Sequence, residues 1–464
     1  MGIVNGSPLE QSATPDTPRR VVVKLHEAAA AASHGLHVAA AFGGTWNALA
    51  DTFPGVQARP YFAGDLDMWF AAGAPPPPAP SLIDTRRYLA VDVPEGIDAM
   101  EVAVTLQESP AVESAYPEGG PTPPPLNPFD DPRSANQGYL SAAPDGIDAR
   151  WAWSSAAADG AGVGFVDLER GWTLDHEDLA GANITIISGE NRDYHGHGTA
   201  VLGEVASRDN ALGGIGIAPA ATTRVVSQWR GGTAYSTAAA ILSAAAAMQP
   251  GDVLLLEAQT TFPTAPGYVP VEVEDLVFDA IHATVASGII VIEAAGNGSV
   301  DLDQFVDLRG RAILNRNSSD FRDSGAILVG AASAGVPHQR LGFSNFGTRI
   351  DCFAWGELID TCGDGGVGQA IDTYTTGFGG TSGASPIVTG CALLLQSWRL
   401  HAGLARCTAT EMRRLLADPS VNTSSSSPAS DRIGVMPDLR AIIQGHTAAA
   451  SIVPPAPADS TALL

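Results

Sequence analysis

Three short segments place an acid, a base and a nucleophile along the chain in the order aspartate, histidine, serine. Asp167 follows the apolar run 163–166, His197 lies in a Gly-His-Gly-Thr segment, and Ser382 lies in the glycine-rich segment 380–386. A serine hydroxyl needs a neutral imidazole to take its proton, and the imidazole needs a carboxylate that fixes its tautomer. The three residue types together favour nucleophilic catalysis of acyl transfer.

Each of these residues also has an ordinary structural interpretation. Asp167 could cap the end of a strand, and Ser382 could cap the helix that follows it. His197 could begin a helix or join His195 in a metal site, although two histidines two residues apart are a weak zinc signal. The joint occurrence of all three, in this order, favours the catalytic interpretation.

An asparagine completes the set. The apolar run 289–292 is followed by Glu-Ala-Ala-Gly and then Asn297. Acyl transfer needs hydrogen-bond donors aimed at the developing oxyanion, and a side-chain amide together with the backbone N–H of the nucleophile is one solution. Asn297 is the candidate for that amide. Alternatively, it only forms a turn after the strand.

The segments that must position these residues alternate between apolar runs and alanine-rich helical stretches. Such alternation predicts an α/β fold, a mostly parallel sheet with helices on both faces. The predicted strands are 163–166, 253–256 and 289–293, and the predicted helices are 197–207, 238–248, 274–287 and 384–395.

A smaller domain is expected before this one. Strands are predicted at 19–25, 87–93 and 111–116, with a helix over 98–107, a pattern typical of a small α+β domain. The expected organisation is a flexible lead over 1–18, the α+β domain over 19–117, a proline-rich linker over 118–138, the catalytic-type domain over 139–445 and a disordered tail over 446–464.

Composition excludes several classes of partner. The formal net charge is −25, from 50 acidic and 25 basic residues, which argues against nucleic acids and anionic membranes because both attract basic proteins. No run reaches the length of a transmembrane helix, and residues 1–8 lack the pattern of a secretory signal. The expectation is a cytoplasmic protein or one exported by another route.

The four cysteines are too few for a disulfide scaffold. Cys352 and Cys362 could form a bridge, or all four could be free thiols, and the sequence leaves both open.

The segments around Asp167, His197, Asn297 and Ser382 resemble the subtilisin-like serine protease family, the subtilases, over roughly residues 139–445. Supporting segments are 176–179, 214–219, 344–347 and 434–439. The resemblance implies a subtilisin-like fold and a serine endopeptidase acting on proteins or peptides through an acyl-enzyme. It assigns Asp167 as the orienting acid, His197 as general base and then acid, Ser382 as nucleophile and Asn297 as oxyanion donor. No cofactor is implied for the chemistry. Structural calcium is common in the family, but no ligand set or other metal site is identified here.

Substrate-binding residues follow from the same resemblance. Glu257, Ala258 and Gln259 fall in the strand that binds the substrate backbone, and Ala295 and Gly296 precede the oxyanion asparagine. The family usually has Ser-Leu-Gly-Gly in that strand, so Glu257 and Gln259 depart from its pattern.

One hypothesis is that Glu257, or Asp301 with Asp303, gives the primary specificity pocket a negative wall that favours basic substrate residues. The alternative is that Glu257 pairs with an internal partner.

The N-terminal domain resembles the inhibitory propeptide of subtilases, a ferredoxin-like α+β domain, most clearly over 112–117. This resemblance implies that the domain acts as an intramolecular inhibitor or chaperone and is cleaved off between Tyr116 and Tyr139. A permanently fused accessory domain is the competing interpretation. For the whole chain, the alternatives are a non-catalytic subtilase-like binding module and, less compatible with the residue order, an esterase.

Overall fold

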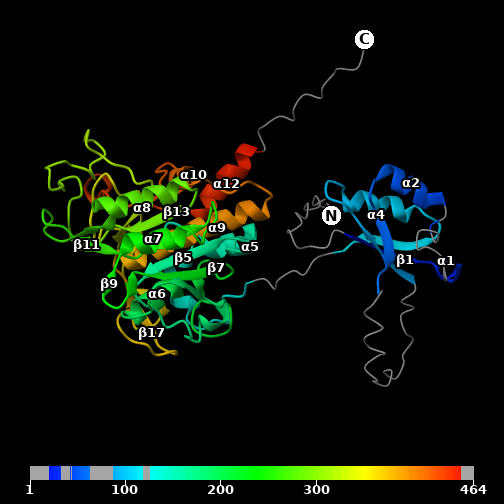
Figure 1. The fold of residues 1–464 in the computed structure, drawn as a ribbon, viewed down its shortest axis with the longest axis horizontal. Helices are drawn as coiled ribbons and strands as arrows, with labels where there is room; N and C mark the ends of the chain where they lie inside the picture. The colour runs from blue at the N-terminus through cyan, green and yellow to red at the C-terminus, as the bar shows by residue number, and fades with distance from the viewer. Residues whose placement is uncertain (1–19, 33–41, 43, 63–86, 119–125, 451–464) are drawn as a thin grey trace, which may run out of the picture. The chain divides into compact units, whose positions relative to one another are not determined.

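The computed structural model describes residues 20–32, 42, 44–62, 87–118 and 126–450. The chain divides into two compact units, Met1–Pro124 and Pro125–Leu464, which are coloured blue to cyan and cyan to red in Figure 1. The predicted lead over 1–18 and most of the tail lie outside the described residues.

The N-terminal unit is a four-stranded antiparallel sheet with the strand order β2-β3-β1-β4. Its elements are β1 (Arg20–Leu25), α1 (Glu27–Ala32), α2 (Gly44–Thr52), β2 (Gln57–Pro60), β3 (Tyr88–Asp92), α4 (Ala99–Gln107) and β4 (Val112–Pro117). The helix α4 begins at Asp98, whose carboxylate accepts a hydrogen bond from the Met100 N–H at 2.8 Å. This element order and sheet order are those of the ferredoxin-like split βαβ arrangement, as the sequence predicted.

The second unit is built on a nine-stranded sheet with the order β18-β19-β15-β14-β13-β10-β5-β7-β6. All neighbouring pairs are parallel except β18 with β19. The strands are β5 (Gly164–Glu169), β6 (Thr185–Ser188), β7 (Thr222–Ser227), β10 (Val253–Leu256), β13 (Ile290–Ala294), β14 (Ile327–Ala332), β15 (Cys352–Trp355), β18 (Thr423–Ser424) and β19 (Val435–Met436). The predicted mostly parallel sheet is therefore confirmed.

Helices cover both faces of this sheet (Figure 1). The helices α6 (His195–Ala206) and α9 (Thr381–His401) pack together on one face, and α7 (Thr237–Ala245) and α8 (Asp275–Ala286) pack together on the other. Further helices are α5 (Ala149–Ala156), α10 (Ala409–Leu416), α11 (Pro428–Asp431) and α12 (Leu439–Ala450). Short hairpins outside the sheet pair β8 (Trp229–Gly231) with β9 (Ala234–Tyr235), β11 (Gln259–Thr261) with β12 (Tyr268–Pro270), and β16 (Ile359–Cys362) with β17 (Tyr374–Phe378).

The central strand β5 differs from the prediction in one consequential way. The sequence predicted that it ends before Asp167, but its ladder with β7 continues through Glu169, which pairs with Ser227. Val166 and Leu168 pack into the apolar cluster beneath α7 and α8. Because side chains alternate along a strand, Asp167 and Glu169 both point to the face covered by α6 and α9.

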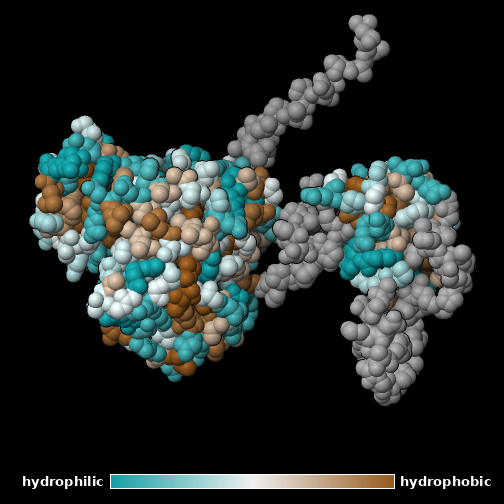
Figure 2. All heavy atoms as spheres, in the orientation of Figure 1, coloured by the Kyte–Doolittle hydropathy of each residue, from teal (hydrophilic) through white to brown (hydrophobic). Residues whose placement is uncertain are grey.

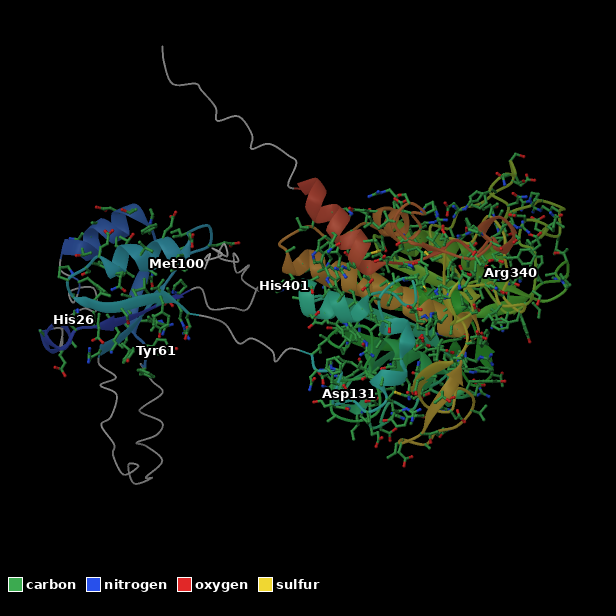
Figure 3. All side chains as sticks on the ribbon, turned by 180° about the vertical axis from the view of Figure 1, so that it is seen from behind. His26, Tyr61, Met100, Asp131, Arg340 and His401 are labelled. Carbon is green, nitrogen blue, oxygen red and sulfur yellow. The ribbon has the colours of Figure 1, made fainter. Side chains whose placement is uncertain are left out.

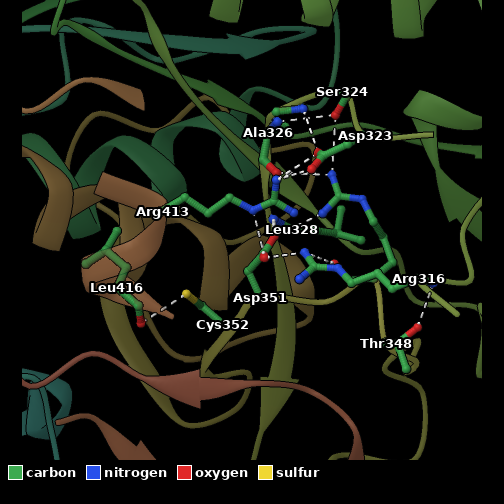
Figure 4. Close-up of polar contacts among 12 residues, drawn as sticks. Arg316, Asp323, Ser324, Ala326, Leu328, Thr348, Asp351, Cys352, Arg413 and Leu416 are labelled. Carbon is green, nitrogen blue, oxygen red and sulfur yellow. Dashed lines mark hydrogen bonds and ion pairs between the residues drawn. The ribbon is translucent and has the colours of Figure 1, made fainter. Parts of the chain in front are cut away.

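A buried ion network ties β14 and β15 to α10 (Figure 4). Arg349 is fully buried and donates to both oxygens of Glu272, at 2.7 and 2.8 Å, and to Asp351 at 2.9 Å. Asp351 also accepts from Arg316 at 2.6 Å and from Arg413 at 2.8 Å. These arginines hold the pKa of Asp351 below its ordinary value in spite of its burial. The charges are paired, as buried charges must be.

All four cysteines are buried, separate thiols, so Cys352 and Cys362 form no bridge. Polar and apolar side chains are interspersed over the visible face of the second unit (Figure 2). Within the described ranges, no helix combines the length and the apolar character needed to cross a bilayer.

Candidate active site

The candidate residues meet at the carboxyl edge of three neighbouring parallel strands. Glu169 is the last residue of β5, Glu257 directly follows β10, and Asn297 follows β13. His197 and Ser382 lie in the first turns of α6 and α9. All five line one cavity of about 690 Å³. Ligands of α/β sheets bind at this edge because the connections leave a crevice there.

His197 is held by Glu169. The ring Nδ1 lies 2.5 Å from Glu169 Oε1, and Glu169 is almost fully buried. The Phe378 ring stands edge-on to the imidazole with 5.4 Å between ring centroids. Burial opposes protonation of the imidazole, but the charge and hydrogen bond of Glu169 outweigh it and raise the pKa of His197 above 6.5. This contact fixes the tautomer with the proton on Nδ1, which leaves Nε2 as the base.

Asp167 does not contact His197, which corrects its assignment as the orienting acid. Its Oδ2 accepts a hydrogen bond from Trp172 Nε1 at 2.6 Å, and its Oδ1 is buried with no hydrogen-bond partner among the described residues. Burial, and then the neighbouring charge of Glu169, raise the pKa of Asp167 well above its ordinary value. The physical reason is the length of β5. Asp167 lies inside the strand, and only Glu169, two residues further on the same face, reaches the histidine.

Asn297 is oriented by the turn that carries the serine. Its Oδ1 accepts from Thr381 N–H at 2.9 Å and from the Thr381 hydroxyl at 3.2 Å. Since a backbone N–H can only donate, the atom facing it must be the amide oxygen. The Nδ2 group has no partner among the described residues and is left as a donor. Gly380 has a φ of +86°, and a Cβ there would lie 3.3 Å from Asn297 Nδ2, so glycine keeps this approach open.

The predicted substrate-binding residues are only partly brought together. Ala258 and Gln259 line the cavity, whereas Ala295 and Gly296 do not. Gln259 Oε1 accepts from the Asn297 N–H at 2.8 Å. A Cβ on Gly383, the residue after the serine, would lie 2.4 Å from Ile359 Cδ1, so a larger residue there requires the end of the Ile359 side chain to move.

The hypothesis of a negative specificity wall is not supported by the positions of its residues. Asp301 and Asp303 lie outside the cavity and are both paired with Arg432, at 2.7 and 2.6 Å. Glu257 borders the cavity but is only 7% exposed, and one of its oxygens contacts the Ser385 hydroxyl. The structure agrees with the alternative, in which Glu257 has an internal partner.

This chain is similar in sequence to known proteins. The sequence profile of the Subtilase family matches residues 185–434, which is more than half of the chain. The chain belongs to the Subtilase family. It is 28% identical over 268 residues to subtilisin DY of Bacillus licheniformis, covering 57% of this chain and 85% of that protein. It is 29% identical over 251 residues to an intracellular serine protease of Paenibacillus polymyxa, covering 51% of this chain and 67% of that protein.

Solved structures agree on the fold of this subtilase. A protease of Pseudoalteromonas arctica superimposes with a TM-score of 0.51 at 22% sequence identity, over 69% of this chain and 99% of that one. At this identity the likeness concerns the fold alone. The profile match begins at residue 185, after β5, so it does not include the strand in which this subtilase has both Asp167 and Glu169.

Glu169 is the functional candidate that the sequence interpretation missed. A signal was present in the alternation of β5, because an acidic residue two positions after Asp167 shares its face if the strand continues. Because the apolar run ends at Val166, the sequence predicted a strand that ends there and does not extend to Glu169.

A cluster of three aspartates outside the cavity has the composition of a cation site. Asp130, Asp131 and Asp209 each bring one oxygen within 4.8 Å of the others, and Asp131 lies at the periphery of the catalytic unit (Figure 3). Asp131 is buried, and within the described ranges its Oδ2 has no hydrogen-bond partner. Burial, together with the neighbouring carboxylates, raises the pKa of Asp131 to about 6. Carboxylate oxygens are the ligands that hard cations such as Ca²⁺ take, so the chemistry of these residues fits a calcium ion, for which the sequence alone identified no ligand set.

Proposed function

We propose that this subtilase is a serine endopeptidase in which Ser382 is the nucleophile, His197 the general base and Glu169 the acid that orients it. One observation carries the proposal. The imidazole held by Glu169 at 2.5 Å borders the same cavity as Ser382 and the free amide of Asn297. Membership of a family of serine proteases and the similarity to subtilisin DY support the reaction class.

The steps follow from these positions. His197 Nε2 takes the Ser382 hydroxyl proton as the oxygen attacks the peptide carbonyl, and Glu169 stabilises the imidazolium that forms. Asn297 Nδ2 donates to the developing oxyanion. His197 then gives its proton to the leaving amine, and water releases the acyl group by the same route in reverse.

A fluorophosphonate probe tests the proposal directly, because it phosphonylates only a serine that a base activates. The full chain, incubated at neutral pH, should be labelled at Ser382, as located by peptide mass spectrometry, and should hydrolyse casein. The heat-denatured chain is the control and should remain unlabelled. A folded chain that is neither labelled nor active on casein would instead favour the binding-module alternative.

Replacement of Asn297 by alanine should reduce kcat roughly 100- to 1,000-fold with little change in KM, a scale measured in subtilisin itself. The reason is that the amide acts on the oxyanion and not on the ground-state carbonyl. Steady-state kinetics on a peptide substrate measure the effect. Gln304→Ala, at a site outside the cavity, is the control. A change confined to KM would contradict an oxyanion role.

The N-terminal unit is proposed to be a propeptide that inhibits or assists folding of the catalytic unit. Its split βαβ strand order and the proline-rich segment after it support this proposal. Cleavage between Tyr116 and Tyr139 would then accompany activation.

Asp130, Asp131 and Asp209 are proposed to hold a structural Ca²⁺. Saturating Ca²⁺ should raise the midpoint of thermal unfolding by roughly 5 °C, because a ligand that binds only the folded state stabilises it by mass action. The stabilisation should fade as the pH drops below about 6, where Asp131 takes up a proton. Differential scanning fluorimetry with and without EGTA measures it. Asp131→Asn should lose the response and Asp279→Asn, on the exposed face of α8, should keep it; a response that persists in Asp131→Asn would place the ion elsewhere.

A further inference from the structure

Glu257 is a buried acid beside the catalytic histidine. The environment of Glu257 does not suit a charged carboxylate. Glu257 is 7% exposed, and its Oε2 is buried without a hydrogen-bond partner in the part of the chain that the structure describes. Its Oε1 contacts the hydroxyl of Ser385, which lies one helical turn after Thr381 in α9. Glu257 therefore touches the helix that carries Ser382.

The hydrogen count at Ser385 decides which form of Glu257 fits. The Ser385 Oγ lies 2.7 Å from the backbone oxygen of Thr381 as well as against Glu257 Oε1. A hydroxyl has one proton to donate, and the Thr381 oxygen can only accept it. An ionised Glu257 would present a second acceptor to a hydroxyl whose proton is already used. A protonated Glu257 instead donates to Ser385, which donates to Thr381, so each of the two hydroxyl protons has an acceptor.

The charges around Glu257 point the same way. One oxygen of Glu257, one oxygen of Glu169 and one ring nitrogen of His197 all lie within 4.8 Å of one another. Asp167 on β5 and Glu204 on α6 are further buried carboxyl groups nearby, and Arg170 is the cation that borders the same cavity. Burial first, and then the charge of Glu169, raise the pKa of Glu257, whereas His197 lowers it. Two carboxylates this close cannot easily both be ionised, and Glu169 is the one paired with His197.

The contact extends to the oxyanion site. Thr381, whose backbone oxygen receives the Ser385 proton, is the residue that orients Asn297 through its N–H and hydroxyl. Ser382 lies between Thr381 and Ser385 in the same turn of α9. A group that fixes this turn therefore fixes the nucleophile and the oxyanion donor together.

We propose that Glu257 is a neutral carboxylic acid in the active enzyme and serves as a positioning residue that, through Ser385, fixes the first turn of α9. The proposal rests on the proposed function for its catalytic consequence, but the protonation of Glu257 stands independently of it. With Glu257 neutral, Glu169 is the carboxylate charge that contacts His197 among the described residues.

Infrared spectroscopy tests the protonation without any need for activity. At neutral pH, the wild type minus Glu257→Gln difference spectrum should contain the carbonyl band of a protonated carboxylic acid, and Glu257→Gln should unfold at a similar temperature. The matched control is Asp279→Asn on the exposed face of α8, whose difference spectrum should contain a carboxylate band instead. A carboxylate band in the Glu257 difference spectrum would overturn the proposal.

The pH profile of kcat/KM gives a second, kinetic test. Glu257→Gln keeps a neutral donor toward Ser385, so its kcat should stay within about tenfold of wild type and its acid-limb midpoint should move by less than about 0.3. If Glu257 were ionised, its removal would destabilise the imidazolium and lower the midpoint by roughly two pH units. Such a fall would overturn the proposal.

Positioning is tested by removing the hydrogen bond. Glu257→Leu and Ser385→Ala should each lower kcat more than about tenfold at nearly constant KM, and the double variant should lose no more than either alone because both act through one contact. Independent, additive losses would overturn the positioning role. A wild-type chain that hydrolyses nothing would overturn the proposed function, whereas the infrared result would still decide the state of Glu257.

Discussion

Substitution of Ser382 by alanine is expected to abolish peptide hydrolysis, with a loss in kcat on the order of 10⁶-fold, the scale that subtilisin shows when its serine is removed. The loss is this large because the proposed acyl-enzyme forms on the Ser382 hydroxyl, which alanine lacks. Hydrolysis of casein and of a chromogenic peptide, followed beside the wild type, measures it. Far-ultraviolet circular dichroism of both chains serves as the folding control, because Ser382 is only partly buried and its loss should leave the fold intact.

The same variant tests the role of the N-terminal unit. After incubation at neutral pH, the intact mass of the wild type should fall by the residues up to a point between Tyr116 and Tyr139, while Ser382→Ala should stay at full length. If both chains remain at full length, the N-terminal unit is a fused accessory domain. If both are shortened, another protease makes the cut and the unit is not removed by self-cleavage.

Glu169→Gln is the second substitution with a large expected effect, a loss in kcat of about 10⁴-fold, the scale seen when the acid of a serine protease triad becomes an amide. The amide can present its NH₂ group to Nδ1, which stabilises the wrong tautomer of His197 and gives no charge to the imidazolium. Asp167→Asn should cost less than about tenfold, because its amide oxygen can still accept the Trp172 hydrogen bond, worth ~1 kcal/mol.

Steady-state kinetics on one peptide substrate distinguish the two carboxyl groups. The pair is a matched control, since both residues are buried, lie on the same face of β5 and are changed to their amides. The reverse order of effects would return the orienting role to Asp167. The acid limb of the pH profile of kcat/KM is a further test of the role of Glu169. Because Glu169 raises the pKa of His197, the residual activity of Glu169→Gln should begin at lower pH than the activity of the wild type.

Much of the fold was predictable because its signals are local. The strand 253–256 and the helix 274–287 were expected from apolar runs and alanine-rich stretches, and they correspond to β10 (Val253–Leu256) and α8 (Asp275–Ala286). Parallel strands buried on both faces give continuous apolar runs, which can be read without knowledge of the partners. The order of the N-terminal elements was predictable because its strand and helix signals are also local, although residues 63–86 lie outside the described residues.

The sequence by itself determined which residues carry the proposed reaction class, Ser382, His197 and Asn297. Their signals are local, because the small residues around each of them belong to a backbone turn within one segment. Only the tertiary structure decided which acid serves His197. That choice depends on how far β5 stays paired with β7. It also depends on whether a carboxylate on β5 reaches the imidazole of His197 on α6, a helix from another part of the chain. The state of Glu257 is likewise a tertiary property, because it follows from a hydroxyl on α9 and from charges on β5 and α6 that no local segment contains.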